Sequence, residues 1–208
     1  GRYLDFMQEN LGSKLKEKEY NEIREYMLGM RALGSMRLLW SAGKAARKSN
    51  VCAYNCSFIA PSKWQDFAEV MYILMCGTGV GYSVEHQTVE MLPMIQRQTG
   101  EKLSKYLIAD SKEGWCDAFT LGLKTWSAGK DIEFDYSAIR PQGARLETMG
   151  GRASGPGPLR ALLEFSREKM MARQGRRLST LDVHDIVCKT GEVVVMGGVR
   201  RSALISLS

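Results

Sequence analysis

Residues 139–159 read IRPQGARLETMGGRASGPGPL. The stretch holds five glycines and three prolines between two apolar, better-patterned segments. Because glycine permits positive φ and proline fixes φ, the chain must follow an irregular path here. Connections of about 20 residues without secondary structure are commonly functional. The arginines Arg140, Arg145 and Arg152, beside exposed backbone amides, suit a phosphate or another anion. Composition alone also allows a surface linker between two domains.

The totals describe an ordinary globular chain with a basic surplus. Its 208 residues suffice for one sizeable α/β domain or one domain with an insertion, and the net charge of +6 favours anionic partners such as nucleotides. The sequence contains no run of about 18 apolar residues that could span a membrane, and it shows no leader that would indicate secretion. Five cysteines are too sparse and odd in number for a disulfide scaffold, so we expect a reducing, cytoplasmic setting.

Hydrophobic spacing and capping residues predict alternating helices and strands. Predicted helices cover residues 19–33, 64–75, 117–127, 159–173 and 180–189. Predicted strands cover residues 36–40, 51–60, 82–84, 192–196 and 204–207. This alternation is typical of an α/β fold, with a mostly parallel sheet and helices outside it.

The segment from Gly77 to Gly81 has the GxGxG spacing that invites a dinucleotide-binding assignment. In that motif the glycines follow a strand and open a helix, so that the helix N-terminus faces the pyrophosphate. Here they close a predicted helix and lead into a predicted strand. The order therefore favours glycines that let a helix end against the sheet over a dinucleotide site.

The cysteines admit several readings. Cys52 and Cys56 share a predicted strand, which would hold their Cα atoms roughly 13 Å apart, too far for a disulfide with each other. His184 and Cys188, at i and i+4 of a predicted helix, could join them around zinc, but CAYNC in a strand is not a zinc-knuckle spacing and zinc is disfavoured. His184 is predicted to be a capping or surface residue. The remaining cysteines are predicted to be small buried residues: Cys76, Cys116 and Cys188.

Several motifs occur in one order: Asn55-Cys56-Ser57-Phe58, LMCGTGVGYSV, DSKEGW, the glycine-rich stretch quoted above, and GGVRRSALISL. Together they resemble the adenosylcobalamin-dependent (class II) ribonucleotide reductases, closest to the monomeric ribonucleoside-triphosphate reductase type. The resemblance runs from about Ala32 onward. It implies a ten-stranded α/β barrel of two five-stranded halves. Residues 1–208 would supply the first half, with an insertion at 85–135 that builds the effector site.

The resemblance also implies roles for individual residues. Cys56 matches the first member of the redox-active cysteine pair that reduces the ribose 2′ position, which requires a reduced, accessible thiol. Ser35 lies in the segment that corresponds to the first substrate-contacting strand. The loop beside the substrate would comprise Arg140, Pro141, Gln142 and Gly143. The effector and specificity residues would be Asp110, Gly197, Gly198, Val199, Arg200, Arg201 and Ser202.

Cofactor and partners follow from the same resemblance. It implies ribonucleotide reduction, with triphosphates indicated by the closest type, a dNTP effector and a thioredoxin-like reductant. Adenosylcobalamin would be the cofactor, with most of its contacts outside this chain. The family's radical cysteine and second redox cysteine have no match in these residues, so we expect a second polypeptide or a further C-terminal half to supply them.

Two other functions are weighed against an enzyme. The chain could be a nucleotide-binding regulatory module that is catalytically incomplete, and reachability of Cys56 to thiol reagents separates this from a redox role. It could also bind nucleic acid through its basic residues, but these are not interleaved with aromatics in one stripe, so a solvated basic face is favoured. Residues 197–202 are predicted to be mobile without ligand, because two glycines and two arginines offer little apolar anchoring.

Overall fold

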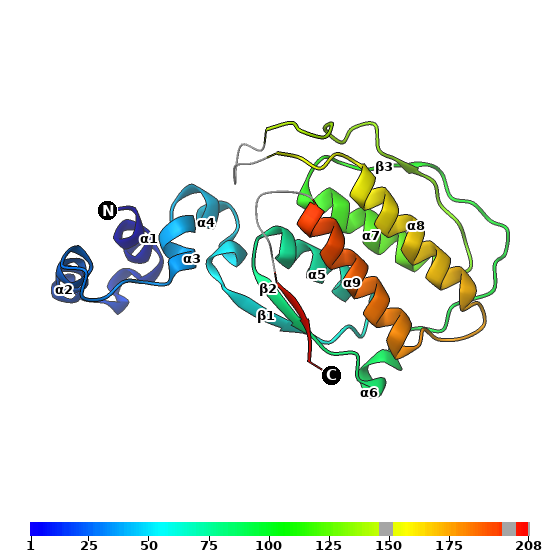
Figure 1. Ribbon diagram of the computed structural model, residues 1–208, viewed down its shortest axis with the longest axis horizontal. Helices are drawn as coiled ribbons and strands as arrows, with labels where there is room; N and C mark the ends of the chain where they lie inside the picture. The colour runs from blue at the N-terminus through cyan, green and yellow to red at the C-terminus, as the bar shows by residue number, and fades with distance from the viewer. Residues whose placement is uncertain (146–151, 197–202, 208) are drawn as a thin grey trace. The chain divides into compact units, whose positions relative to one another are not determined.

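The computed structural model describes residues 1–145, 152–196 and 203–207 (Figure 1). The chain divides into two compact units, Gly1–Asn55 and Cys56–Ser208. Residues 197–202, for which we predict mobility, lie outside the described residues. No helix in the described part of the chain combines the length and hydropathy needed to cross a membrane.

The described first unit is helical. Its helices and 3-10 turns are α1 Arg2–Leu11, η1 Gly12–Lys14, α2 Glu17–Leu28, α3 Met36–Ser41, α4 Lys44–Lys48 and η2 Asn50–Ala53. The predicted helix at 19–33 exists as α2 but ends five residues early, where Gly29 caps it and Met30 adopts a φ of 54°. The predicted strand at 36–40 is wrong, since these residues form α3. A five-residue segment is too short for its periodicity to separate helix from strand.

The second unit contains a parallel sheet, as predicted. Its strands are β1 Cys56–Ile59, β2 Gly79–Tyr82 and β5 Leu204–Ser206, hydrogen-bonded in the order β1-β2-β5. The predicted strand at 51–60 shortens to β1, and the residues before it form η2, so the strand geometry assumed for Cys52 is wrong. The described strands number three in this sheet, and the five-stranded half barrel stays a prediction.

Helices α5 Trp64–Met75 and α9 Thr180–Met196 lie against one face of this sheet, and α7 Lys112–Ser127 and α8 Gly157–Ala172 pack on them as a further layer (Figure 1). The short helix α6 His86–Val89 contacts α9. A separate two-stranded parallel ladder joins β3 Tyr106–Leu107 to β4 Phe134–Asp135. The core is one continuous cluster in which Phe67, Phe119 and Trp126 are among the largest fully buried side chains. Burial of such side chains is the main favourable contribution to folding.

Side-chain caps fix the starts of two helices. Asp66 accepts hydrogen bonds from the backbone N–H groups of Ser62 and Lys63 at the start of α5. Ser111 accepts one from the N–H of Gly114 at the start of α7. Such caps satisfy backbone donors that have no partner inside the helix.

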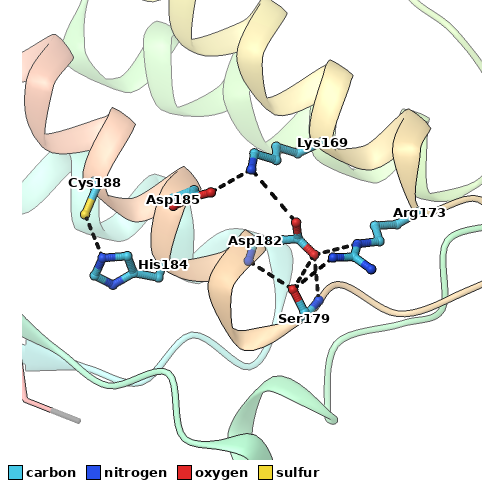
Figure 2. Close-up of polar contacts among 7 residues, drawn as sticks. All are labelled: Lys169, Arg173, Ser179, Asp182, His184, Asp185 and Cys188. Carbon is cyan, nitrogen blue, oxygen red and sulfur yellow. Dashed lines mark hydrogen bonds and ion pairs between the residues drawn. The ribbon is translucent and has the colours of Figure 1, made fainter.

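Polar contacts hold α8 against α9 (Figure 2). Asp182 accepts hydrogen bonds from the backbone N–H and the hydroxyl of Ser179, and pairs with Arg173 at 2.7 Å. One turn further along, Lys169 pairs with Asp185 at 2.6 Å. Asp182 is buried, so these partners are what make its charge tolerable there.

The predicted strand at 192–196 is wrong, because α9 continues through Met196. Val187, Val193 and Val194 are buried at helical spacing against the core. β-branched residues favour strands only weakly, and burial on a helix face overrides that preference here. The predicted order at Gly77–Gly81 is confirmed, since these residues end α5, with Gly77 at φ 82°, and begin β2.

We expect Asp131 to make stability depend on acid pH. Its carboxylate accepts two hydrogen bonds from Arg167, at 3.0 and 2.6 Å, and others from Trp126 and the N–H of Ile132. Arg167, above all, lowers the pKa of Asp131. Because the pKa of Asp131 is lower in the folded chain than in the unfolded chain, its carboxylate stabilises the fold at pH values above the unfolded pKa of about 3.9. This stabilisation is lost as the pH falls from there through the folded pKa.

Asp131→Asn should therefore cost about 1–2 kcal/mol at pH 6, by removing charge-assisted hydrogen bonds. Urea unfolding at pH 6 and at pH 3 measures the effect, and the difference between variant and parent should shrink at pH 3. A difference that is equal at both pH values would contradict the prediction.

Candidate functional site

The face of the sheet that the helices leave uncovered carries Cys56. Along β1 the side chains alternate, with Cys56 and Phe58 exposed and Ser57 and Ile59 partly buried. Ile59 packs against the helix-covered core. Because successive residues of a strand point to opposite faces, Cys56 and Phe58 lie on the face away from the helices.

Glycine backbone lies beside these residues on β2. Cys56 is in register with Gly79, and Phe58 with Gly81, which in turn is in register with Ile205 of β5. The exposed fractions agree with this placement: 57% for Phe58 and 58% for Ile205, against 1% for Tyr82 on the helix side. The uncovered face therefore presents one thiol and three apolar side chains, those of Phe58, Ile205 and Leu207. Leu207 lies over the buried Gly81, so the accessible glycine backbone beside Cys56 is that of Gly79.

The described cysteines differ in exposure. Cys56 and Cys188 are exposed, Cys52 and Cys76 are buried, and Cys116 is intermediate. Cys116 donates to the carbonyl of Ala68, and burial raises its pKa to about 12, so its thiol stays protonated. The prediction that Cys188 is buried is wrong, because its side of α9 faces outward. A neutral thiol is a poor nucleophile, so Cys116 is less reactive than an exposed cysteine.

The structure brings two predicted site residues together. Arg140 donates from Nε to Oδ2 of Asp110 at 2.6 Å, which joins the start of the glycine-rich stretch to a residue two positions before α7. Two other residues of the DSKEGW motif have structural roles at the start of α7. Ser111 caps the helix, and Gly114 packs so closely against Ala109 that a Cβ on Gly114 would lie 2.5 Å from the Ala109 carbonyl oxygen. Asp110 is thus the member of this motif that reaches another predicted site segment.

The described ends of the glycine-rich stretch run antiparallel to each other. The N–H of Gly143 donates to the carbonyl oxygen of Ala153 at 2.8 Å, and the N–H of Ala153 donates to the carbonyl oxygen of Ala144 at 2.7 Å. Gly143 has φ 89°, a conformation that favours glycine. Pro141 and Gln142 are exposed at the base of this ribbon. Residues 146–151, between the two ends, lie outside the described residues.

The roles of two other predicted groups stay predictions. Ser35 belongs to the first unit, where it accepts a hydrogen bond from Asn55 at 3.5 Å, and its substrate role stays a prediction. The specificity loop from Gly197 to Ser202 lies outside the described residues. In the part of the chain that is described, no group of three or more His, Cys, Asp and Glu side chains could hold a metal ion.

Sequence reasoning missed a cluster of three polar side chains. Tyr82 of β2 lies beside His184 and Cys188 of α9, with its hydroxyl 2.8 Å from Nδ1 and 3.3 Å from Sγ. The i, i+4 spacing of His184 and Cys188 was visible in the sequence. Tyr82, 102 residues away from His184, has no local signal that connects it to them.

Comparisons with known proteins agree with the motifs. Residues 82–168 match the family model of the B12-dependent ribonucleotide reductase insertion domain. The chain is 32% identical over 202 residues to the adenosylcobalamin-dependent ribonucleoside-triphosphate reductase of Euglena gracilis, covering 93% of this chain and 27% of that protein. The Lactobacillus leichmannii reductase of the same name is 28% identical over 260 residues, covering 97% of this chain and 35% of that protein.

The fold points to the same class. A crystal structure of a B12-dependent (class II) ribonucleotide reductase superposes with a TM-score of 0.80 at 24% identity, covering 99% of this chain and 37% of that one. The fold is thus α/β with a helical insertion. The chain matches the N-terminal part of B12-dependent ribonucleotide reductases, and the resemblance predicted from its motifs is confirmed. It spans about a third of the length of these curated relatives.

The described residues do not themselves fit a cobalamin site. A corrin ring needs a broad, well-enclosed cavity. The groove between α5 and α7 has a volume of about 400 Å³ and is rimmed by Glu69, Glu113 and Asp117. Of the two histidines, His86 pairs with Glu90, and His184 contacts Tyr82 and Cys188. The chemistry assigned to this chain is therefore that of its own thiols and polar groups.

Proposed function

We propose that this chain supplies the first part of the catalytic domain of an adenosylcobalamin-dependent ribonucleoside-triphosphate reductase. Cys56 is its redox thiol, and it gives up electrons as the ribose 2′ position is reduced. The observation that carries the proposal is the exposed thiol of Cys56 on the helix-free face of a parallel sheet. A redox thiol must be reached by both substrate and reductant, and this position permits it.

The surroundings of Cys56 support a substrate there. Gly79 carries no side chain beside Cys56, so a sugar can approach the β2 backbone closely at that position. Phe58, Ile205 and Leu207 add apolar surface on the same face that can exclude water. Hydrogen bonds and ion pairs to the nucleotide then come from other segments of the protein. Ligand sites typically have apolar walls and only a few polar groups.

Arg140, Pro141, Gln142 and Gly143 form the loop that contacts the nucleotide. The ion pair of Arg140 with Asp110 supports a link between this loop and the effector segment, because a ligand that draws on either side chain changes the other. Asp110 and the residues from Gly197 to Ser202 serve the dNTP effector. Triphosphate substrates, adenosylcobalamin and a thioredoxin-like reductant complete the proposal, together with the remaining part of the catalytic domain.

A chimera tests the proposal. The segment of the Euglena gracilis reductase that aligns with this chain is replaced by residues 1–208, and cobalamin-dependent reduction of ribonucleoside triphosphates is measured with a dithiol reductant. We expect turnover that requires the cofactor and responds to dNTP. The same enzyme with its aligned segment deleted is the control. A folded chimera that binds nucleotide but reduces none would contradict the proposal.

A further inference from the structure

The cluster of Tyr82, His184 and Cys188 closes a ring of contacts. The hydroxyl of Tyr82 lies 2.8 Å from Nδ1 of His184 and 3.3 Å from Sγ of Cys188, and Nε2 of His184 lies 3.5 Å from the same Sγ. Figure 2 shows His184 and Cys188 together on α9, on a different side from the Lys169, Asp182 and Asp185 ion pairs.

One tautomer satisfies all three contacts. The thiol of Cys188 donates to Nε2, the protonated Nδ1 donates to the oxygen of Tyr82, and the hydroxyl of Tyr82 donates to Sγ. When the thiol proton moves to Nε2, the thiolate accepts from both the imidazolium and the hydroxyl. The imidazolium in turn keeps an acceptor at each nitrogen. The charge-separated pair therefore loses no hydrogen bond.

Burial separates the roles of the three groups. Tyr82 is buried, and burial, above all, raises the pKa of its hydroxyl well above the usual value, so it remains a proton donor. Cys188 is exposed, so a reagent can reach its sulfur. A thiol with a neighbouring base and an open approach is the arrangement found at reactive cysteines.

We propose that Cys188 is a reactive thiol that forms mixed disulfides with low-molecular-weight disulfides such as glutathione disulfide. His184 accepts the thiol proton, and Tyr82 stabilises the thiolate by a hydrogen bond. This modification site lies on the helix side of the sheet, away from Cys56, and does not depend on the proposed reductase activity.

The exchange balances within the named groups. The proton of Cys188 moves to Nε2 of His184, and the thiolate attacks one sulfur of glutathione disulfide. A new S–S bond forms at Cys188 as the glutathione S–S bond breaks. The Cys188 sulfur is oxidised and the leaving glutathione sulfur is reduced. The departing thiolate takes the proton from His184.

The test uses the whole 208-residue chain and glutathione disulfide at pH 7. The rate of mixed-disulfide formation at Cys188 is followed by peptide mass spectrometry in the parent, in His184→Gln and in Tyr82→Phe. The matched control is His86→Gln, which removes the other histidine, exposed on α6. The rate of modification at Cys56 in the same samples is the internal control for the concentration and activity of glutathione disulfide.

A free thiol is only a few per cent thiolate at pH 7, so losing its base should slow Cys188 about tenfold in His184→Gln. Tyr82→Phe should slow it about threefold, and His86→Gln should leave it unchanged. Equal rates in the parent and a folded His184→Gln overturn the proposal. A second comparison needs no variant: the parent's Cys188 should react faster folded than unfolded in urea, and a slower folded rate also overturns it.

Discussion

Replacing Cys56 with serine should lower steady-state turnover of the chimeric reductase to below roughly one hundredth of the parent value. Serine nearly matches cysteine in size, so the exposed start of β1 should keep its structure. A hydroxyl cannot form the disulfide that carries electrons from reductant to substrate, so each catalytic cycle would stop after oxidation of the site. The loss should appear in kcat, with nucleotide binding retained.

Cys188→Ser is the matched control for this experiment. It removes the other exposed cysteine of the chain, on the helix side of the sheet, and should leave turnover near the parent value. Turnover is measured as deoxyribonucleotide formed over many cycles with excess dithiol. If Cys56→Ser kept even a tenth of the parent rate, Cys56 would be an exposed thiol without a redox role.

Phe119→Ala should destabilise the chain by about 3–5 kcal/mol, the usual cost of removing a buried phenylalanine ring. Phe119 lies on α7 and is fully buried in the core cluster. Its loss leaves a cavity among rigid helices that can close only partly. The free energy of unfolding from urea titrations, with the slope compared between variants, measures the effect.

Asp117→Ala on the same helix is the control for that experiment. Asp117 is exposed, so its replacement should change the free energy of unfolding by about 0.5 kcal/mol or less. A cost for Phe119→Ala that is no larger than this would show that α7 is not packed as described.

Local patterns predicted the elements that have long periodicity or explicit capping residues. The apolar face identifies α5, the periodicity of residues 159–173 identifies α8, and the glycines at 77–81 mark the passage from α5 to β2. These signals are local, because they depend on residues within one or two helical turns. The motif around Cys56 likewise indicated both the family and the residue to examine.

Tertiary structure decided what local patterns leave open. Residues 36–40 and 192–196 could form either helix or strand, and both are helical. Burial of Val193 and Val194 against the core favours the helix in the second segment. Burial of Ile59 against the helices turned Cys56 to the uncovered face. The pairs Arg140–Asp110 and Tyr82–His184 join residues 30 and 102 positions apart. Sequence spacing carries no information on such contacts, because they arise only when the sheet and its covering helices bring distant segments within hydrogen-bond distance.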